Sequence, residues 1–296
     1  MTTPRALQPN DTIGLAVTSH LATREGYAGI LQAVEGMGYR VKTAPHFYSA
    51  SYGYLASEEE RAEGFNALVR DPDVRMIFFG GGEGASELLP LLDYDAIAKN
   101  PKLIASYSDG TSVLNAITSK TRLVTYYGQT PGCLPGMTAS ERAHFDAHFV
   151  KGGASAFEKT TEWKACHAGV CEGELIGGYT RNFTMLVNGD YLRWEPGRRY
   201  ILFLEERECF IGEAGVSMYL SHVEQCAAIG QISGLLFGAF ADEPKPHLLA
   251  RLARFGEKHD IPVVYCDDFG HGANHGILPI GRMAQLDADK LTLTYL

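Results

Sequence analysis

Ser108 stands at a point in the sequence where a hydroxyl group could act as a nucleophile. The apolar run 103–106 predicts a strand, Ser108 and Asp109 follow it, and a helical pattern begins at Thr111. At the start of a helix, unpaired backbone N–H groups and the helix dipole favour developing negative charge. A serine that attacks a carbonyl group needs that environment for the oxyanion it creates. The alternative is that Ser108 or Asp109 only caps the helix.

Two further polar side chains follow predicted buried strands and could supply the acid and base that such a serine requires. Glu205 is the first residue after the apolar run 201–204, and His271 lies between two glycines just beyond the strand 261–265. A glutamate there could instead lie on the solvated rim of the sheet. His275 is a second candidate for the base. The chain order Ser, Glu, His provides a nucleophile, an orienting acid and a base.

A glycine-rich stretch, residues 80–84 (GGGEG), lies between a predicted strand and a helical pattern. It is not a P-loop, because no Gly-Lys-Ser/Thr follows, and it lacks the G-x-G-x-x-G spacing. Glycines allow close approach of the backbone, so this loop could offer an N–H group to an oxyanion as readily as to a phosphate. A plain tight turn is the other alternative.

The histidines other than His271 and His275, among them His20, are interpreted as surface or packing residues.

Composition argues against several classes of function. The chain has 296 residues and a formal net charge of −9 with no Lys/Arg block, so we expect no nucleic-acid partner. We also expect no membrane span, because no apolar run is long enough to cross a bilayer. We expect no signal peptide, because residues 1–10 lack a basic region followed by an apolar run. Six scattered cysteines without a Cys-x-x-Cys pair predict a cytoplasmic protein with reduced thiols. Cys166, His167 and Cys171 lack a second ligand pair, so we expect no metal site.

The elements that must position these residues alternate between strand and helix in the first half of the chain. Nearly continuous apolar strands in such an alternation indicate a parallel sheet covered on both faces. In such a sheet the functional site forms beyond the carboxyl ends of the strands. The predicted strands are 12–17, 39–43, 74–79, 103–106 and 123–127, and the predicted helices are 24–37, one opened by a capping box at Ser57 and Glu60, and 111–119.

The predicted fold is α/β, with an N-terminal parallel-sheet α/β domain and a smaller mixed α/β C-terminal domain. Residues 1–152 form the first domain and carry the nucleophile, the polar stretch 153–171 is a linker, and residues 172–296 form the second domain with the Glu and His. In the second domain the predicted strands are 172–176, 200–204, 232–237, 261–265 and 291–296, and the predicted helices are 213–226 and 247–258.

In combination these motifs resemble those of the serine L,D-carboxypeptidase family, which includes muropeptide L,D-carboxypeptidases and microcin C self-immunity peptidases. Residues 7–14 (LQPNDTIG) are similar to the family's opening L-x-P-G-D-x-I-G, and residues 106–109 (SYSD) to its Gly-Tyr/Phe-Ser-Asp. Residues 202–206 (LFLEE) and 268–271 (DFGH) resemble the other two catalytic segments. The similarity extends over nearly the whole chain, and the three motifs occur in the family's order.

The resemblance implies a role for each of these residues. Ser108 resembles the nucleophile, Glu205 the orienting acid and His271 the general base. The backbone amides of Gly82 and Asp109 would form the oxyanion hole, with Gly81 the weaker candidate. The implied enzyme is a homodimer that needs no cofactor. It cleaves an amide bond in a small peptide or muropeptide through an acyl-enzyme.

Two departures from the family pattern bear on the substrate. Gly80 and Glu83 stand where muropeptide enzymes usually have Arg and Tyr, which favours a neutral or cationic substrate group over an acidic one. Hydrolysis of peptidyl or aminoacyl nucleotide conjugates, as in the microcin C branch, therefore remains an alternative. A non-catalytic protein that binds a nucleotide or another small ligand at the glycine loop is an alternative of a different class.

Overall fold

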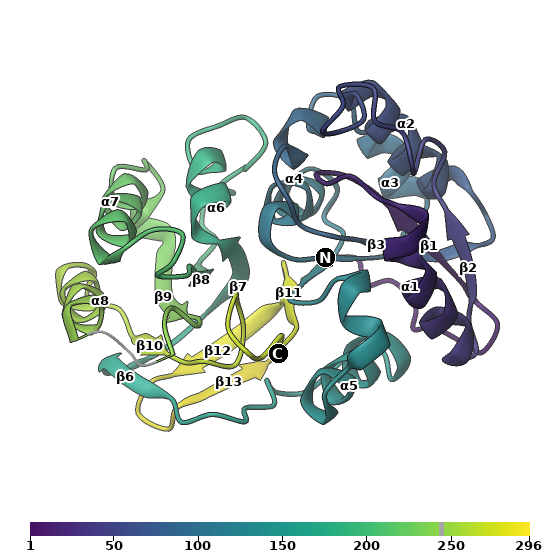
Figure 1. The fold of residues 1–296 in the computed structure, drawn as a ribbon. Coiled ribbons are helices and arrows are strands. Elements are labelled where there is room, and N and C mark those ends of the chain that lie inside the picture. Colours follow the sequence, from purple (N-terminus) through teal and green to yellow (C-terminus); the bar gives the residue numbers. More distant parts are fainter. Residues whose placement is uncertain (243–245) are drawn as a thin grey trace. The chain divides into compact units, whose positions relative to one another are not determined.

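The computed structural model describes residues 1–242 and 246–296, and the chain forms two compact units, Met1–Gly153 and Ala154–Leu296. Each unit contains one sheet with its own helices (Figure 1). The predicted α/β class is confirmed, with a parallel sheet in the first unit and a mixed sheet in the second. Among the described helices, none combines the length and apolar character needed to cross a membrane.

The sheet of the N-terminal unit is parallel, with its strands in the order β5-β4-β3-β1-β2. The strands are β1 (Thr12–Ala16), β2 (Arg40–Thr43), β3 (Val74–Phe79), β4 (Leu103–Ser106) and β5 (Thr125–Tyr127). The direction of winding reverses between β1 and β3. In open α/β sheets, ligands bind beyond the carboxyl ends of the strands at such a reversal. The segments after β1 and β3 are therefore the first place to look for a site.

Helices flank these strands on both sides, with α2, α3 and α4 on one side and α1 on the other (Figure 1). The helices are α1 (Arg24–Gly36), α2 (Glu58–Arg70), α3 (Tyr94–Lys99), α4 (Thr111–Thr121) and α5 (Ala139–Phe145), and the short helical turns are η1 (Ala85–Leu88), η2 (Ser108–Gly110), η3 (Pro131–Gly136) and η4 (Asp146–Val150). The predicted capping box is present at the start of α2. The Ser57 side chain accepts from the Glu60 N–H, and the Glu60 carboxylate accepts from the Ser57 N–H at 2.9 Å.

The C-terminal unit contains a mixed sheet in the order β13-β12-β7-β8-β9-β10-β6. Strands β7 to β10 are parallel to one another, whereas β6, β12 and β13 pair in antiparallel fashion. The strands of this unit are β6 (Lys164–His167), β7 (Val170–Tyr179), β8 (Tyr200–Glu205), β9 (Ile232–Phe237), β10 (Val263–Tyr265), β11 (Leu278–Ile280), β12 (Met283–Asp287) and β13 (Thr292–Tyr295).

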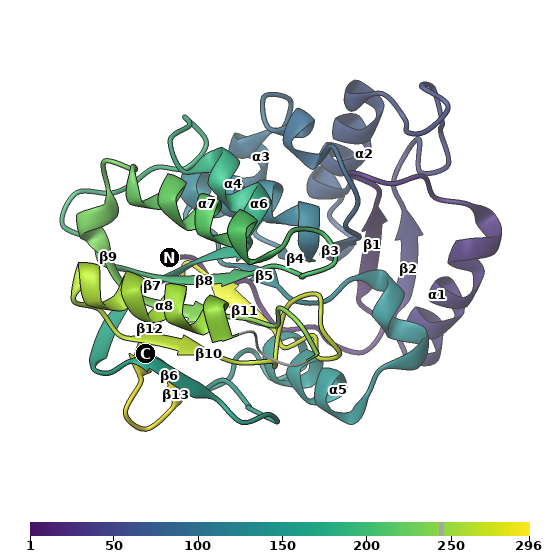
Figure 2. The ribbon, with the colours of Figure 1, turned by 60° about the vertical axis from the view of Figure 1, so that its left-hand side comes forward.

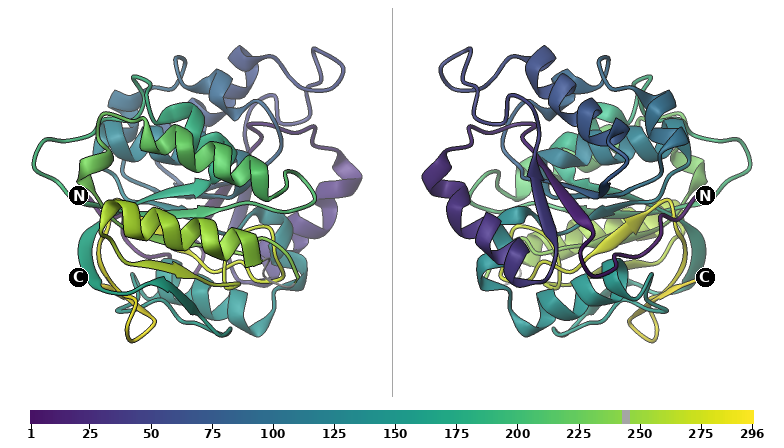
Figure 3. Two further views of the ribbon diagram at one scale, coloured as in Figure 1. Left: turned by 90° about the vertical axis from the view of Figure 1, so that its left-hand side faces the viewer. Right: turned by 90° about the vertical axis from the view of Figure 1, so that its right-hand side faces the viewer.

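The helices of this unit are α6 (Thr180–Leu186), α7 (Glu213–Glu224) and α8 (Pro246–His259), with the short turn η5 (Ile229–Gln231) before β9. Each of the three helices connects two neighbouring parallel strands. Because these connections advance across the sheet in one direction, right-handed crossovers place all three helices on the same face. They lie side by side in Figure 2, and the left view of Figure 3 shows α7 in green beside α8 in yellow-green.

The segment 153–171, predicted as a linker, contributes structure to the C-terminal unit. It contains β6, and it buries the side chains of Phe157 and Trp163. Asp268, itself buried, accepts hydrogen bonds from the backbone N–H groups of Thr160 and Thr161 at 3.0 Å and from the Trp163 indole at 2.6 Å. A buried carboxylate needs such donors. The segment therefore anchors the loop that continues from Asp268 to His271.

Candidate active site

Ser108 lies just beyond the carboxyl end of β4, in a left-handed backbone conformation with φ of +56°. A non-glycine residue pays about 1–3 kcal/mol for such backbone strain, which is typical of functional strand-to-helix turns. The turn η2 leads directly into α4, so Ser108 occupies the predicted position between strand and helix. Neither η2 nor α4, both inside the described range 1–242, has a side-chain N-cap hydrogen bond. The N-cap residues of these two elements are Tyr107 and Gly110.

Close backbone packing surrounds this turn. The Ser106 hydroxyl donates to the Phe79 carbonyl oxygen at 2.9 Å and so ties β4 to β3. A Cβ atom on Gly110 would lie 2.1 Å from Ser106 Oγ, and one on Gly81 would lie 2.8 Å from the Ser108 Cβ. Real Cβ atoms do not approach that closely, so both positions require glycine. The glycine loop therefore packs directly against the predicted nucleophile.

Hydrogen bonds fix the rest of the glycine loop. Gly82 has φ of +148°, and a Cβ there would lie 1.9 Å from the Ser19 carbonyl oxygen. The Glu83 N–H donates to the same oxygen at 2.8 Å. The Asp109 carboxylate accepts from the Ala85 N–H at 2.7 Å, which ties the nucleophile turn to the end of the loop. The two amides predicted for the oxyanion hole thus belong to two segments that the structure joins.

Arg61 is a supporting residue that the sequence analysis did not identify. It lies on α2 and is only 3% exposed. Its guanidinium donates to the carbonyl oxygens of Thr18 at 2.5 Å and Gly84 at 3.0 Å, and it pairs with Glu87. It therefore holds the segment after β1 and the glycine loop together. The available signal was a charged residue on the otherwise apolar face of a predicted helix.

Glu205 and His271 form a hydrogen-bonded pair in the C-terminal unit. His271 Nδ1 lies 2.9 Å and 3.0 Å from the two carboxylate oxygens of Glu205, and the His271 backbone N–H donates to Oε2 at 3.1 Å. The Glu205 side chain is fully buried, so it is not the solvated rim residue of the alternative interpretation. The His271 side chain remains 13% exposed. A carboxylate at Nδ1 fixes the tautomer in which Nε2 can accept a proton.

Two glycines make this pairing possible. Gly270 has φ of +103°, and a Cβ there would lie 2.8 Å from both Cβ and Oε2 of Glu205. A Cβ on Gly238 would lie 2.9 Å from the Glu205 Cβ. Two aromatic rings contact the His271 imidazole, Tyr179 at a centroid distance of 4.7 Å and Phe210 edge-on at 5.2 Å. The ring is therefore held in place by both packing and hydrogen bonding.

The structure brings the predicted residues together in two groups. Ser108 and Asp109 lie with the glycine loop in the N-terminal unit. Glu205 and His271 lie together in the C-terminal unit. Each group has a well-defined internal geometry.

His20, interpreted from the sequence as a surface or packing residue, is a packing residue beside the glycine loop. Its ring packs on the glycine loop, since a Cβ on Gly80 would lie 3.0 Å from His20 Cε1. Its Nε2 lies 2.6 Å from the Tyr27 hydroxyl, and burial lowers the pKa of the imidazole. His20 thus occupies the space that a side chain at position 80 would need.

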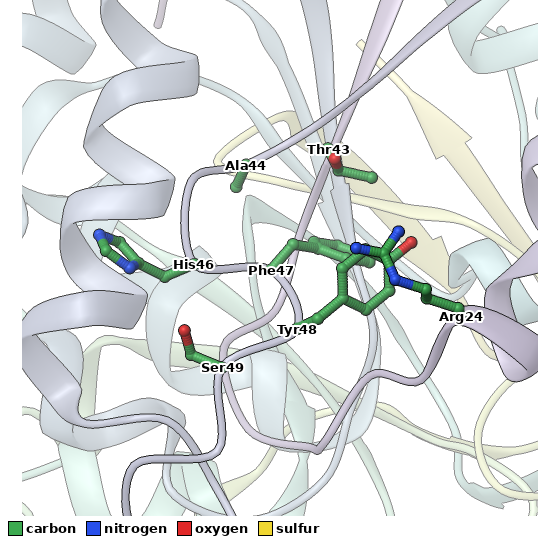
Figure 4. A pocket seen from close by; sticks show the side chains of 7 residues that line it. All are labelled: Arg24, Thr43, Ala44, His46, Phe47, Tyr48 and Ser49. Atoms are coloured by element: carbon green, nitrogen blue, oxygen red, sulfur yellow. The ribbon is translucent and has the colours of Figure 1, made fainter.

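A shallow pocket of about 510 Å³ lies at the carboxyl end of β2 (Figure 4). The Arg24 guanidinium stands 4.7 Å from the centre of the Tyr48 ring, where cation–π attraction is favourable. Phe47 contacts both Tyr48 and Tyr27, at centroid distances of 5.0 and 4.8 Å. Aromatic contacts therefore run from this pocket towards His20 and the glycine loop.

Two family models match the chain. The LD-carboxypeptidase N-terminal domain matches residues 13–128, and the LD-carboxypeptidase C-terminal domain matches residues 172–286. The chain belongs to the LD-carboxypeptidase family. The chain is therefore an enzyme of the serine peptidase and hydrolase class.

The chain is similar to curated relatives that have functional names. The microcin C7 self-immunity protein MccF of Escherichia coli is 38% identical over 133 residues, which are 44% of this chain and 38% of that protein. The murein tetrapeptide carboxypeptidase of Pseudomonas aeruginosa is 26% identical over 295 residues, which are 94% of this chain and 93% of that protein.

Solved structures share the fold of this chain over its whole length. An MccF-like protein from Bacillus anthracis superimposes with a TM-score of 0.88 at 23% identity, covering 100% of this chain and 99% of that one. MccF in complex with aspartyl sulfamoyl adenosine gives a TM-score of 0.84 at 23% identity, covering 100% and 98%. At this level of identity the likeness shows the fold.

Proposed function

We propose that this enzyme is a serine carboxypeptidase of the L,D type that acts through Ser108, His271 and Glu205 without a metal or cofactor. The observation that carries the proposal is the hydrogen bond between the Glu205 carboxylate and His271 Nδ1. It orients the imidazole and selects the tautomer that can take a proton from a serine hydroxyl. It also favours His271 over His275 as the base. The strained strand-end position of Ser108 supports its role as the nucleophile.

The proposed reaction follows the acyl-enzyme route. Ser108 Oγ attacks the amide carbonyl carbon while its proton passes to His271 Nε2. The negative charge on the carbonyl oxygen is stabilised by the backbone N–H groups of Gly82 and Asp109. Collapse breaks the C–N bond, and His271 gives the proton to the leaving amine. Water then attacks the ester with His271 again acting as base, which releases the acid and restores Ser108. Glu205 stabilises the imidazolium in both steps.

Two substrate classes are supported by the named relatives. A relative that matches nearly the whole chain is a murein tetrapeptide carboxypeptidase, so a muropeptide tail that ends in D-alanine is the first proposal. The 38% identity to MccF over 133 residues favours an aminoacyl or peptidyl nucleotide conjugate as the second. Both are small substrates with an amide bond that the same three residues could cleave.

We further propose that the enzyme is a homodimer and that it is located in the cytoplasm, each on a single line of support. The dimer rests on the resemblance to the family alone. The cytoplasmic location rests on the six cysteines, all of which are free thiols, as expected in a reducing compartment.

The proposal can be tested by mass spectrometry of two reactions. The wild-type enzyme and the Ser108→Ala variant are each incubated with a murein tetrapeptide and with an aminoacyl sulfamoyl adenosine. Loss of D-alanine from the first, or release of the amino acid from the second, is expected with the wild type only. Whichever substrate is cleaved identifies the substrate class. Cleavage of neither by the wild type, or of both by Ser108→Ala, would contradict the proposal.

A further inference from the structure

Glu206, the residue after the proposed orienting acid, is a buried carboxyl group that the proposed mechanism does not use. It is 0% exposed. Its Oε1 accepts from the Arg207 backbone N–H at 3.1 Å. Its Oε2 is buried and has no hydrogen-bond partner among the described residues. A buried carboxylate with so few donors is unfavourable, whereas the neutral acid is tolerated.

The surroundings of Glu206 keep its carboxyl group neutral up to a higher pH than that of an exposed glutamate. Burial, as the largest cause, together with the charge of neighbouring Glu205, raises the pKa of Glu206 to about 7, against the opposing effects of the Arg207 N–H, Tyr179 and His271. The titratable and charged groups around it come from several elements: Glu205 on β8, Arg207 in the segment after it, Tyr179 on β7, Arg181 on α6, Tyr219 on α7, and His271 in the loop after β10. Arg207 is paired with Asp242 at 2.5 Å.

We propose that Glu206 is a positioning residue that controls, through its own protonation, how strongly the site stabilises a protonated His271. This inference rests on the proposed roles of Ser108 and His271. Tyr179 links the two groups, because its ring contacts His271 at 4.7 Å and its hydroxyl interacts with Glu206. When Glu206 is ionised, a second negative charge beside Glu205 stabilises the imidazolium that forms as Ser108 attacks. When Glu206 is protonated, that stabilisation is absent.

The isosteric variant Glu206→Gln separates these two states, because glutamine mimics the neutral acid at every pH. At pH 5.5, where wild-type Glu206 is protonated, the kcat of wild type and Glu206→Gln should agree within about twofold. At pH 8.5, where wild-type Glu206 is ionised, the wild type should be faster by about tenfold, the effect of one pKa unit of coupling. Glu208→Gln is the matched control, since it removes an exposed carboxylate two residues further on and should leave the ratio near one at both pH values.

A stability measurement tests the protonation of Glu206 independently of catalysis. A carboxyl group with a raised folded-state pKa contributes stability below its unfolded-state value, and that contribution is lost as the pH rises through the folded-state value. The Tm of the wild type relative to Glu206→Gln should therefore fall between about pH 4.5 and pH 7. Glu208→Gln should show no such relative change.

The outcomes distinguish the inference from the proposed function. A rate ratio between wild type and Glu206→Gln that is independent of pH overturns the role of Glu206, and so does a pH-independent difference in Tm. Full activity of Ser108→Ala overturns the proposed function instead. A pH-dependent rate ratio together with a pH-dependent Tm difference supports the inference.

Discussion

At the scale of single residues, the chemistry depends on side chains whose surroundings leave them little freedom. Ser108 is held in a left-handed conformation with Gly81 packed against it. His271 is fixed by the Glu205 carboxylate and by two aromatic rings. Such preorganisation is what general acid–base catalysis requires, because the groups need not reorganise as charge develops.

The assignment of His271 as the base can be tested by comparing it with His275, the other candidate. His271→Ala should lower kcat by about 10³-fold or more, because it removes the imidazole that takes the serine proton. His275→Ala should retain most activity. Steady-state kinetics of the two variants check both expectations. A severe loss in His275→Ala with a mild loss in His271→Ala would mean that the wrong histidine was chosen.

The sequence could predict which polar residues follow the strands, but not how they contact one another. Ser108, Glu205 and His271 each stood out because an apolar run precedes them. The contact of His271 with Glu205 depends on Gly270 and on long-range packing of β8 against the loop after β10, which no local pattern encodes. The packing partner of His20 could not be predicted for the same reason, since only the folded chain brings its ring onto Gly80.

At the scale of elements, the glycine loop after β3 is the segment with the least tolerance for change. Its position between Ser19 and Ser108 leaves no room for side chains at Gly81 or Gly82. Arg61 on α2 secures it from the other side through Thr18 and Gly84. A loop held in this way can present an amide in a fixed direction, which is the property that an oxyanion donor needs.

Gly82→Ala should damage both stability and activity. The added Cβ would lie 1.9 Å from the Ser19 carbonyl oxygen at φ of +148°, so the free energy of unfolding should fall by about 1–3 kcal/mol. The kcat should fall by about 10²-fold as the proposed oxyanion donor is displaced. Gly29→Ala is the control, because Gly29 lies inside α1 with open space around it and alanine favours a helix. Urea unfolding measures the free energy of unfolding, and steady-state kinetics measure kcat. If Gly82→Ala and Gly29→Ala had the same values of both, this role of the loop would be contradicted.

Strands with a largely apolar sequence were predicted well, and strands that mix apolar and polar residues were not. The bounds predicted for β3, β4 and β9 agree with the structure because each is a largely apolar run. Strand β12 (Met283–Asp287) was missed because a glutamine and an aspartate interrupt its short apolar pattern. Strand β6 was missed because its register is set by antiparallel pairing with β10, a contact distant in sequence.

At the scale of the whole molecule, charge distinguishes between possible substrates. The formal net charge is −9, and the exposed Glu83 adds a carboxylate to the glycine loop. Net charge of one sign slows the approach of ligands of the same sign, and salt screens the effect. The enzyme should therefore favour neutral or cationic groups over acidic ones.

This preference can be measured with a matched pair of tetrapeptides that differ only in whether the acidic stem group is free or amidated. The amidated form should have the higher kcat/KM, by about three- to tenfold at low ionic strength, and the ratio should shrink as salt is added. Glu83→Gln should reduce the ratio. Faster processing of the free acid would contradict this interpretation of Gly80 and Glu83 and favour the ordinary muropeptide role.

The most direct test of the account is the turnover of Ser108→Ala on whichever substrate the wild type cleaves. With the nucleophile removed, kcat should fall by about 10⁴-fold or more while the Tm stays close to that of the wild type. Ser86→Ala, which removes an exposed hydroxyl from η1, should keep wild-type kcat. Near-normal turnover by a folded Ser108→Ala protein would contradict the central claim that Ser108 carries the acyl group.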